Sequence, residues 1–116
     1  MEYLVIQSRM FSAKARFLRL SLEDIRAIEN EVMADPTAWP VIPGTHGLRK
    51  MRFSPDRRAG GKSGGLRICY FFVDESKRVY LLTAFAKNVQ TNLSMADRQA
   101  LGQVVAFIKA HDRQEP

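Results

Sequence analysis

Residues 66–86, LRICYFFVDESKRVYLLTAFA, contain two apolar segments joined by a short polar turn. The first segment, residues 66–73, is apolar except for Arg67. It is too apolar for a solvent-exposed position, which predicts a central strand. Residues 74–77 predict a turn, and residues 78–86 predict the next strand. Two strands joined this closely form an antiparallel hairpin.

Residues 48–53, LRKMRF, predict a further strand upstream of the hairpin. Side chains alternate between the faces of a strand, so Met51 and Phe53 are expected to face the core. Lys50 and Arg52 then lie together on the opposite face. With a short first strand at residues 3–7, the pattern predicts an α+β domain: a small antiparallel sheet with its helices packed on one face.

Two helices are predicted with clear starts. Ser21 and Asp24 have the spacing of a capping box, and a helix is expected over residues 21–35, ended by Pro36. Ser94 and Asp97 resemble a second start, for a helix over residues 95–111. Residues 11–18 predict a helical turn or a short helix. The two apolar faces are expected at Leu22, Ile25, Ile28 and Val32, and at Leu101, Val104, Val105 and Ile108.

Residues 36–47, PTAWPVIPGTHG, are rich in proline and glycine and predict an irregular connection. We expect Trp39 and Ile42 to anchor this connection to the core. The alternative for Trp39 is a platform on which a nucleobase stacks.

The positive charge is localised. The chain has 116 residues, 46% of them hydrophobic, which suits a single folded domain (residues 1–116). Residues 47–67 hold seven of the 18 basic residues and one of the 12 acidic residues, and this difference equals the net charge of +6. A localised basic stretch favours a polyanion such as RNA or DNA as the partner, the alternative being a solvated basic loop.

The glycine-rich residues 54–65 join the two basic strands and carry Arg57, Arg58 and Lys62. Four glycines predict a mobile loop that would bring these three cations to RNA phosphates. Gly61-Lys62-Ser63 resembles the end of a P-loop, but Asp56 stands where that motif needs its first glycine, and a strand follows.

Other chemistries find little support. One cysteine and two histidines, His46 and His111, do not predict a metal site, and no cofactor is expected. Cys69 lies inside a predicted strand, so we expect a buried, inert thiol in a reducing compartment. The N-terminal residues resemble neither a signal peptide nor a membrane span, which predicts a cytoplasmic protein with no membrane partner.

Four cations are predicted to meet at one end of the sheet. Arg67 begins one strand of the hairpin, Lys87 follows the other, and Lys50 and Arg52 lie on the neighbouring strand. Like charges held together favour a bound anion, for which a single phosphate is suitable. The alternative is a set of solvated surface cations.

At these positions the chain resembles the RelE/ParE superfamily of toxins from type II toxin–antitoxin modules, and the HigB-type RelE toxins in particular. The resemblance is carried by residues 41–50 (VIPGTHGLRK), by Gly65-Leu66-Arg67-Ile68 with Tyr70, and by Leu82-Thr83 with Ala86-Lys87-Asn88. It covers nearly the whole chain.

This resemblance implies a microbial RNase-like fold, a cognate antitoxin as protein partner, a possible toxin–antitoxin hetero-oligomer, and cleavage of mRNA on the ribosome. The implied chemistry is attack of a 2′-OH on the adjacent phosphate without a metal. Carried over by position, the catalytic residues are Lys50, Arg52, Arg67 and Lys87. The RNA-binding residues are expected to be Arg57, Arg58, Lys62, Asn88 and His46.

The chain departs from the RelE pattern after Lys87. RelE has a second arginine and then a tyrosine, where this chain has Asn88 and the region of Leu93-Ser94. The general base is therefore open: Lys50, whose neutral form neighbouring cations would favour, is the first candidate, and His46 the second. Two further functions stay possible: a ParE-like toxin that binds gyrase without cutting RNA, and a basic module that only binds RNA or the ribosome.

Overall fold

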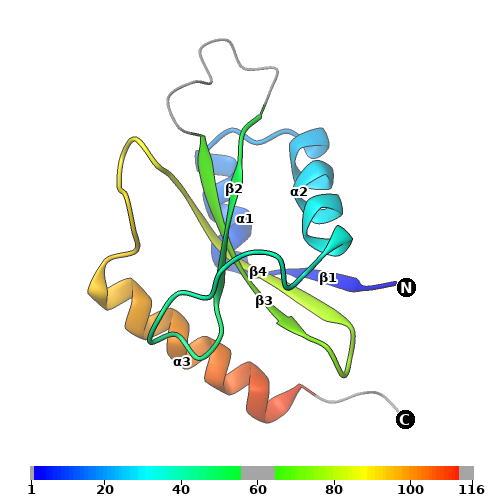
Figure 1. The fold of residues 1–116 in the computed structure, drawn as a ribbon. Helices are drawn as coiled ribbons and strands as arrows, with labels where there is room; N and C mark the ends of the chain where they lie inside the picture. The colour runs from blue at the N-terminus through cyan, green and yellow to red at the C-terminus, as the bar shows by residue number, and fades with distance from the viewer. Residues whose placement is uncertain (1, 56–64, 113–116) are drawn as a thin grey trace.

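The computed structural model describes residues 2–55 and 65–112, which form an α+β domain with three helices and a four-stranded sheet (Figure 1). The elements in chain order are β1 (Leu4–Gln7), α1 (Arg9–Phe17), α2 (Leu22–Ala34), β2 (Arg49–Phe53), β3 (Leu66–Val73), β4 (Arg78–Ala86) and α3 (Met95–His111). The strand order is β1-β4-β3-β2, so β3 is a central strand, as predicted. The predicted α+β class is confirmed. None of the helices in the described ranges is long and apolar enough to cross a membrane.

The sheet is mixed, whereas the sequence predicted an antiparallel one. Strands β2, β3 and β4 pair antiparallel, but β1 runs parallel to β4, with Leu4 beside Arg78. No hairpin turn links β1 to β4, since α1, α2, β2 and β3 lie between them in the chain. Nothing therefore forces these two strands to run in opposite directions.

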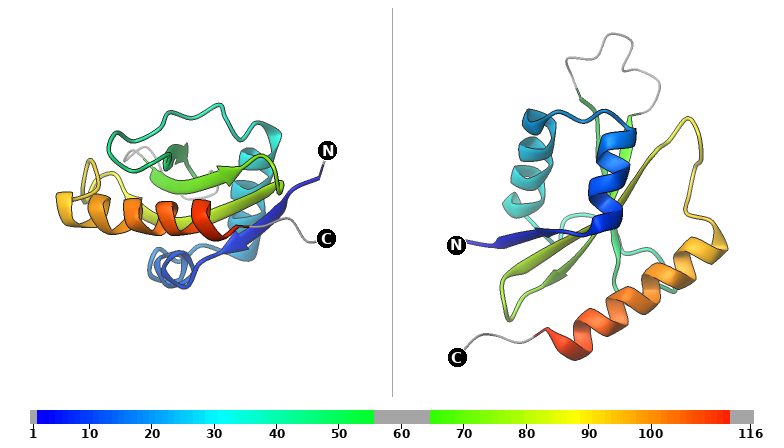
Figure 2. Two further views of the ribbon diagram at one scale, coloured as in Figure 1. Left: turned by 90° about the horizontal axis from the view of Figure 1, so that it is seen from below. Right: turned by 180° about the vertical axis from the view of Figure 1, so that it is seen from behind.

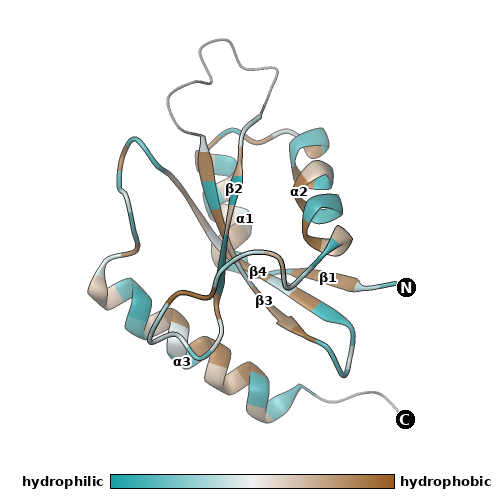
Figure 3. Cartoon of the chain, in the orientation of Figure 1, coloured by the Kyte–Doolittle hydropathy of each residue, from teal (hydrophilic) through white to brown (hydrophobic). Residues whose placement is uncertain are grey.

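The helices cover both faces of the sheet, so their predicted placement on one face is wrong. On β3, Ile68 and Tyr70 pack in one cluster with residues of α1 and α2, such as Phe11 and Ile28. Cys69 lies in a second cluster on the other face, with residues of α3 such as Leu101 and Val105. The cause is the apolar character of β3, whose side chains need cover on both sides. Hydrophobic residues follow one another along this strand in Figure 3.

The helix starts agree with the prediction. The hydroxyl of Ser21 accepts a hydrogen bond from the Asp24 amide at 3.0 Å, and the Asp24 carboxylate accepts one from the Ser21 amide at 2.9 Å. The hydroxyl of Ser94 accepts one from the Asp97 amide at 3.1 Å. Both caps satisfy amides that the helix itself leaves without a partner.

Two residues assigned to the buried helix faces are exposed. Leu22 is 66% exposed and Val104 is 41% exposed. Leu22 is the first residue of α2, and its buried face is formed further along by Ile28 and Val32. On α3, Leu101 and Val105 are one turn apart, and Val104 lies to the side of the stripe that they form.

The segment of residues 36–48 is tied to the edge of the sheet. The Tyr70 hydroxyl donates to the carbonyl of Pro36 at 2.6 Å, and the Lys50 amide donates to that of Pro40 at 3.1 Å. Ile42 is buried and Trp39 is half-buried against the core, as predicted. In the view from below, this segment and α1 lie on opposite sides of the sheet (Figure 2).

Candidate functional site

The pairing of β2 with β3 brings the predicted cations together. Arg52 lies directly opposite Arg67, and Lys50 lies opposite Cys69, two positions along the same face. Opposed residues in an antiparallel pair have Cβ atoms roughly 5 Å apart, so two guanidinium groups leave the sheet side by side. Like charges at such a pair cost free energy, which an anion bound between them recovers.

A surface pocket of about 290 Å³ lies at these residues, and we call it the basic pocket. It is lined by Trp39, Pro40, Lys50, Arg52 and Arg67. Three of its five residues are cations, and the other two come from the segment that crosses the edge of the sheet. The pocket therefore combines three cationic side chains with one aromatic side chain, that of Trp39.

Lys50 is held in place by a residue that the sequence analysis did not select. Its ammonium donates a hydrogen bond to the side-chain oxygen of Asn92 at 2.7 Å. Asn92 lies between β4 and α3, shortly before the cap at Ser94. Its place in the chain could have indicated Asn92, because the segment after β4 has to start from the same end of the sheet as Arg67.

The two arginines differ in their settings. Arg67 is half-buried, and its guanidinium donates to the carbonyl of Leu66 at 3.2 Å. Arg52 is exposed and also lines a second pocket of about 300 Å³, together with Glu23 and Glu31 of α2. Packing thus fixes Arg67 more firmly, while Arg52 lies between a basic and an acidic surface.

The remaining predicted residues of the β-sheet end, where the structure describes them, do not line the basic pocket. The Lys87 amide donates to the carbonyl of Gly65 at 3.1 Å, which puts Lys87 at the same end of the sheet as Arg67. The side chains of Lys87 and Asn88 are exposed, and neither residue lines the basic pocket. Arg57, Arg58 and Lys62 lie outside the described residues, as does most of the predicted mobile loop.

His46 is not brought to the basic pocket. It adopts a left-handed backbone, with φ of 63°, and lines a different pocket together with Phe71 and Lys109. The segment of residues 41–48 turns His46 toward α3, where its ring lies near Gly102. As the second candidate for the general base, His46 loses its geometric support.

Cys69 is buried, as predicted. Burial raises the pKa of its thiol to about 12, although the nearby Lys50 ammonium acts in the opposite direction. A thiol with this pKa stays protonated at neutral pH and does not act as a nucleophile. Among residues 2–55 and 65–112, no three His, Cys, Asp or Glu side chains are grouped as metal ligands would be.

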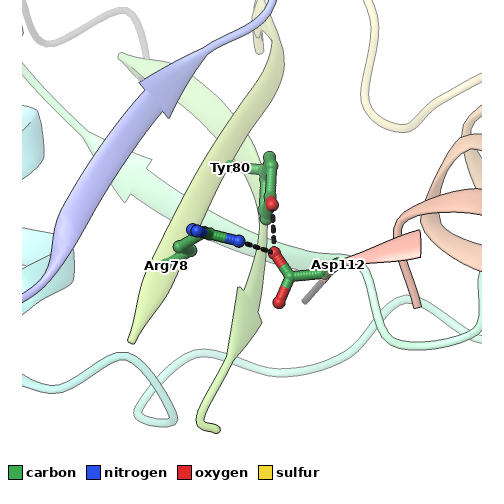
Figure 4. Close-up of polar contacts among 3 residues, drawn as sticks. All are labelled: Arg78, Tyr80 and Asp112. Carbon is green, nitrogen blue, oxygen red and sulfur yellow. Dashed lines mark hydrogen bonds and ion pairs between the residues drawn. The ribbon is translucent and has the colours of Figure 1, made fainter. Parts of the chain in front are cut away.

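The opposite end of the sheet carries a different polar cluster (Figure 4). The Asp112 carboxylate accepts a hydrogen bond from Arg78 at 3.0 Å and a short one from the Tyr80 hydroxyl. Burial acts to raise the pKa of Asp112, but the neighbouring Ser76, Tyr80 and Arg78 side chains outweigh it and hold the pKa below 3.8. This cluster joins the end of α3 to β4 and stabilises the fold.

Solved structures share this fold. A mutant of the E. coli toxin RelE in the free state matches with a TM-score of 0.53 and 18% identity, over 78% of this chain and 90% of that one. The intact E. coli RelBE toxin–antitoxin complex matches with a TM-score of 0.54 and 19% identity, over 73% of this chain and 96% of that one.

A conserved hypothetical protein from Helicobacter pylori matches with a TM-score of 0.52 and 16% identity, over 73% of this chain and 94% of that one. No protein-family model matches the chain. The chain therefore has the RelE-like fold that its sequence predicted, and identities this low establish the fold alone.

Proposed function

We propose that this chain is the toxin of a type II toxin–antitoxin module, of the HigB type, and that it cleaves mRNA on the ribosome. The observation that carries the proposal is the basic pocket, in which Lys50, Arg52 and Arg67 share one face of a RelE-like sheet. Solvated surface cations would not need to converge from two strands on a single pocket.

The reaction is an internal phosphoryl transfer. The 2′-oxygen of a ribose attacks the adjacent phosphorus, forming the O2′–P bond while the P–O5′ bond breaks. The products are a 2′,3′-cyclic phosphate and a free 5′-OH. One proton leaves the 2′-OH and one is delivered to the 5′-oxygen, so the reaction consumes no other reactant. The protein contributes position, charge stabilisation and proton transfer.

Arg67 is suited to stabilising the phosphoryl group. A guanidinium contacts two phosphate oxygens at once, which an ammonium does not. Arg52, directly opposite in the sheet, adds a second positive charge to the same anion. Lys87, at the same end of the sheet, would meet the phosphate backbone beyond the pocket.

Lys50 is the remaining candidate for moving a proton. Its nitrogen lies on the pocket wall and is oriented by Asn92. Either an amine or an ammonium makes this hydrogen bond, so the contact fits a group that gives and takes a proton. This assignment follows from elimination, since Cys69 is buried and His46 lines another pocket.

A cytoplasmic antitoxin is the proposed protein partner. The net charge of +6 resides in residues 47–67, which favours an acidic segment that covers the basic pocket. Co-expression with a neighbouring gene should give a complex that weakens as salt is added. A complex that leaves Arg67 accessible would contradict this mode of inhibition.

The proposed activity is tested by brief induction of the chain followed by mapping of mRNA 5′ ends. We expect new 5′-OH ends within translated codons, and about 10- to 100-fold less cleavage when Arg67→Ala is induced to the same level. Growth arrest without new RNA ends would contradict the nuclease and would favour a gyrase-binding toxin. Binding to ribosomes with neither effect would favour a basic binding module.

A further inference from the structure

We propose that Trp39 stacks on a nucleobase beside the phosphate in the basic pocket, and so makes this pocket a nucleotide site. The proposal rests on the proposed function for the nature of the ligand. It starts from one observation: the only tryptophan of the chain lines the same pocket as three cations from β2 and β3.

The backbone of Trp39 is held by hydrogen bonds and its side chain packs against the first hydrophobic cluster, so its ring is a preformed surface. The Arg49 guanidinium donates to the Trp39 carbonyl at 2.6 Å and to the Thr37 carbonyl at 3.2 Å. The Lys50 amide donates to the next carbonyl, that of Pro40, at 3.1 Å. An aromatic ring held this way loses little conformational entropy when a base stacks on it.

Packing in the core also buries only part of Trp39. This residue packs against the first hydrophobic cluster but stays half-buried, whereas the large core side chains such as Phe11 and Tyr70 have no exposed surface. A residue needed only for packing would gain from full burial. Part of Trp39 instead forms a wall of the basic pocket.

The chemistry of the two walls selects the ligand. A nucleotide combines a planar aromatic ring with an anionic phosphate at a fixed separation, and the pocket offers Trp39 for the first and the guanidinium of Arg67 for the second. An acidic peptide would use the cations alone. At about 290 Å³ the pocket is at the small end of ligand sites, which suits one nucleotide.

Tryptophan fluorescence tests this directly, because Trp39 is the only tryptophan in the chain. The probe is a short oligoribonucleotide methylated at every 2′-oxygen, so that it cannot be cleaved. The matched probe has the same length and phosphates but one abasic position, moved along the strand. Fluorescence anisotropy of a dye on the oligonucleotide reports binding, and Trp39 emission reports stacking.

We expect the intact probe to quench Trp39 emission and an abasic probe to bind without quenching at one register. Trp39→Leu should weaken binding of the intact probe by about 5- to 150-fold, since base stacking on an aromatic residue contributes that much. It should weaken binding of that abasic probe far less. Trp39→Phe keeps an aromatic ring and should recover most of the affinity.

Two results would overturn the proposal. If every abasic probe quenches like the intact one, Trp39 senses the phosphates and no base stacks there, while the phosphate site itself stands. If neither probe binds, the basic pocket is not a nucleotide site, and the mapping of mRNA 5′ ends decides the proposed function separately. Should Trp39→Leu unfold, Trp39→Phe and the two probes on the parent protein still decide between these outcomes.

Discussion

The hairpin of β3 and β4 carries an arginine at each end, in opposite settings. At the turn, Arg78 is met by the Asp112 carboxylate, and the pair is largely covered, with side chains 20% and 3% exposed. At the open end, Arg67 faces another arginine, Arg52, across the sheet. One end joins opposite charges and the other places like charges together.

The difference separates stability from function. An ion pair that closes the end of a helix onto a strand stabilises the fold and offers a ligand nothing. Opposed arginines cost the fold free energy, and residues that do so are common where a protein binds an anion. Changes at the turn end should therefore reduce stability, and changes at the open end should reduce activity.

The strongest test of this division between the two ends is Arg67→Ala. We expect the variant to fold at least as stably as the parent and to lose about 10- to 100-fold in single-turnover mRNA cleavage on saturating ribosomes, because a charge-assisted contact to the transition state contributes about 1.5–3 kcal/mol. Arg67→Lys should recover part of the rate.

The matched control for this change is Arg78→Ala, which removes the arginine at the other end of the same hairpin. It should lower stability and leave cleavage by the folded protein unchanged. If Arg67→Ala cleaves as fast as the parent, the open end of the sheet is not the catalytic site.

Asn92→Ala tests the positioning of Lys50. Losing the acceptor at 2.7 Å should lower the cleavage rate by about 2- to 10-fold, the value of one hydrogen bond, with little change in substrate binding. Asn92→Asp keeps an acceptor oxygen and should restore part of the rate. Equal losses in both variants would show that Asn92 acts otherwise than by holding Lys50.

Asp112→Asn probes the turn end. Removing the charge should lower the free energy of unfolding by about 1 kcal/mol, as urea denaturation would show, and leave cleavage by the folded protein unaltered. Reduced cleavage at full stability would mean that the two ends do not divide the tasks as proposed.

The stability that Asp112 contributes should also depend on pH. Its pKa in the folded protein lies below the ordinary value of 3.8, so the contribution is complete above about pH 4 and is lost as the pH falls through the lower, folded-state pKa. The difference in unfolding free energy between the parent and Asp112→Asn should accordingly shrink on acidification. A constant difference down to pH 2 would contradict the assignment.

The smallest expected effect is that of Cys69→Ala. Cys69 lies opposite Lys50 but is fully buried, and its thiol has a pKa of about 12. We expect cleavage at the parental rate, and alkylation of the parent's thiol only when the protein unfolds. A fast reaction with iodoacetamide in the folded state would place Cys69 in the accessible site after all.

Local pattern predicted most of the elements, and tertiary context decided the rest. The alternation in residues 48–53 put Lys50 and Arg52 on one face, and the pairing of β2 with β3 put Arg67 beside them. Neither pattern shows which way β1 runs, because its pairing with β4 depends on packing between segments far apart in sequence. The sequence analysis did not identify Asn92 for the same reason, since its contact with Lys50 spans 42 positions.

The parallel pairing of β1 with β4 also has a consequence for the order in which the protein is made. Ser8 donates to the carbonyl of Leu82, 74 positions later. The first strand and α1, which contacts β4, thus leave the ribosome long before their partners exist. Until residue 78 and its successors emerge, β1 has no strand to pair with, and α1 lacks β4, which it contacts in the finished fold. Long-range closure of this kind is slow and comes late in folding. A nascent chain should therefore complete both faces of its sheet only after β4 and α3 have been synthesised.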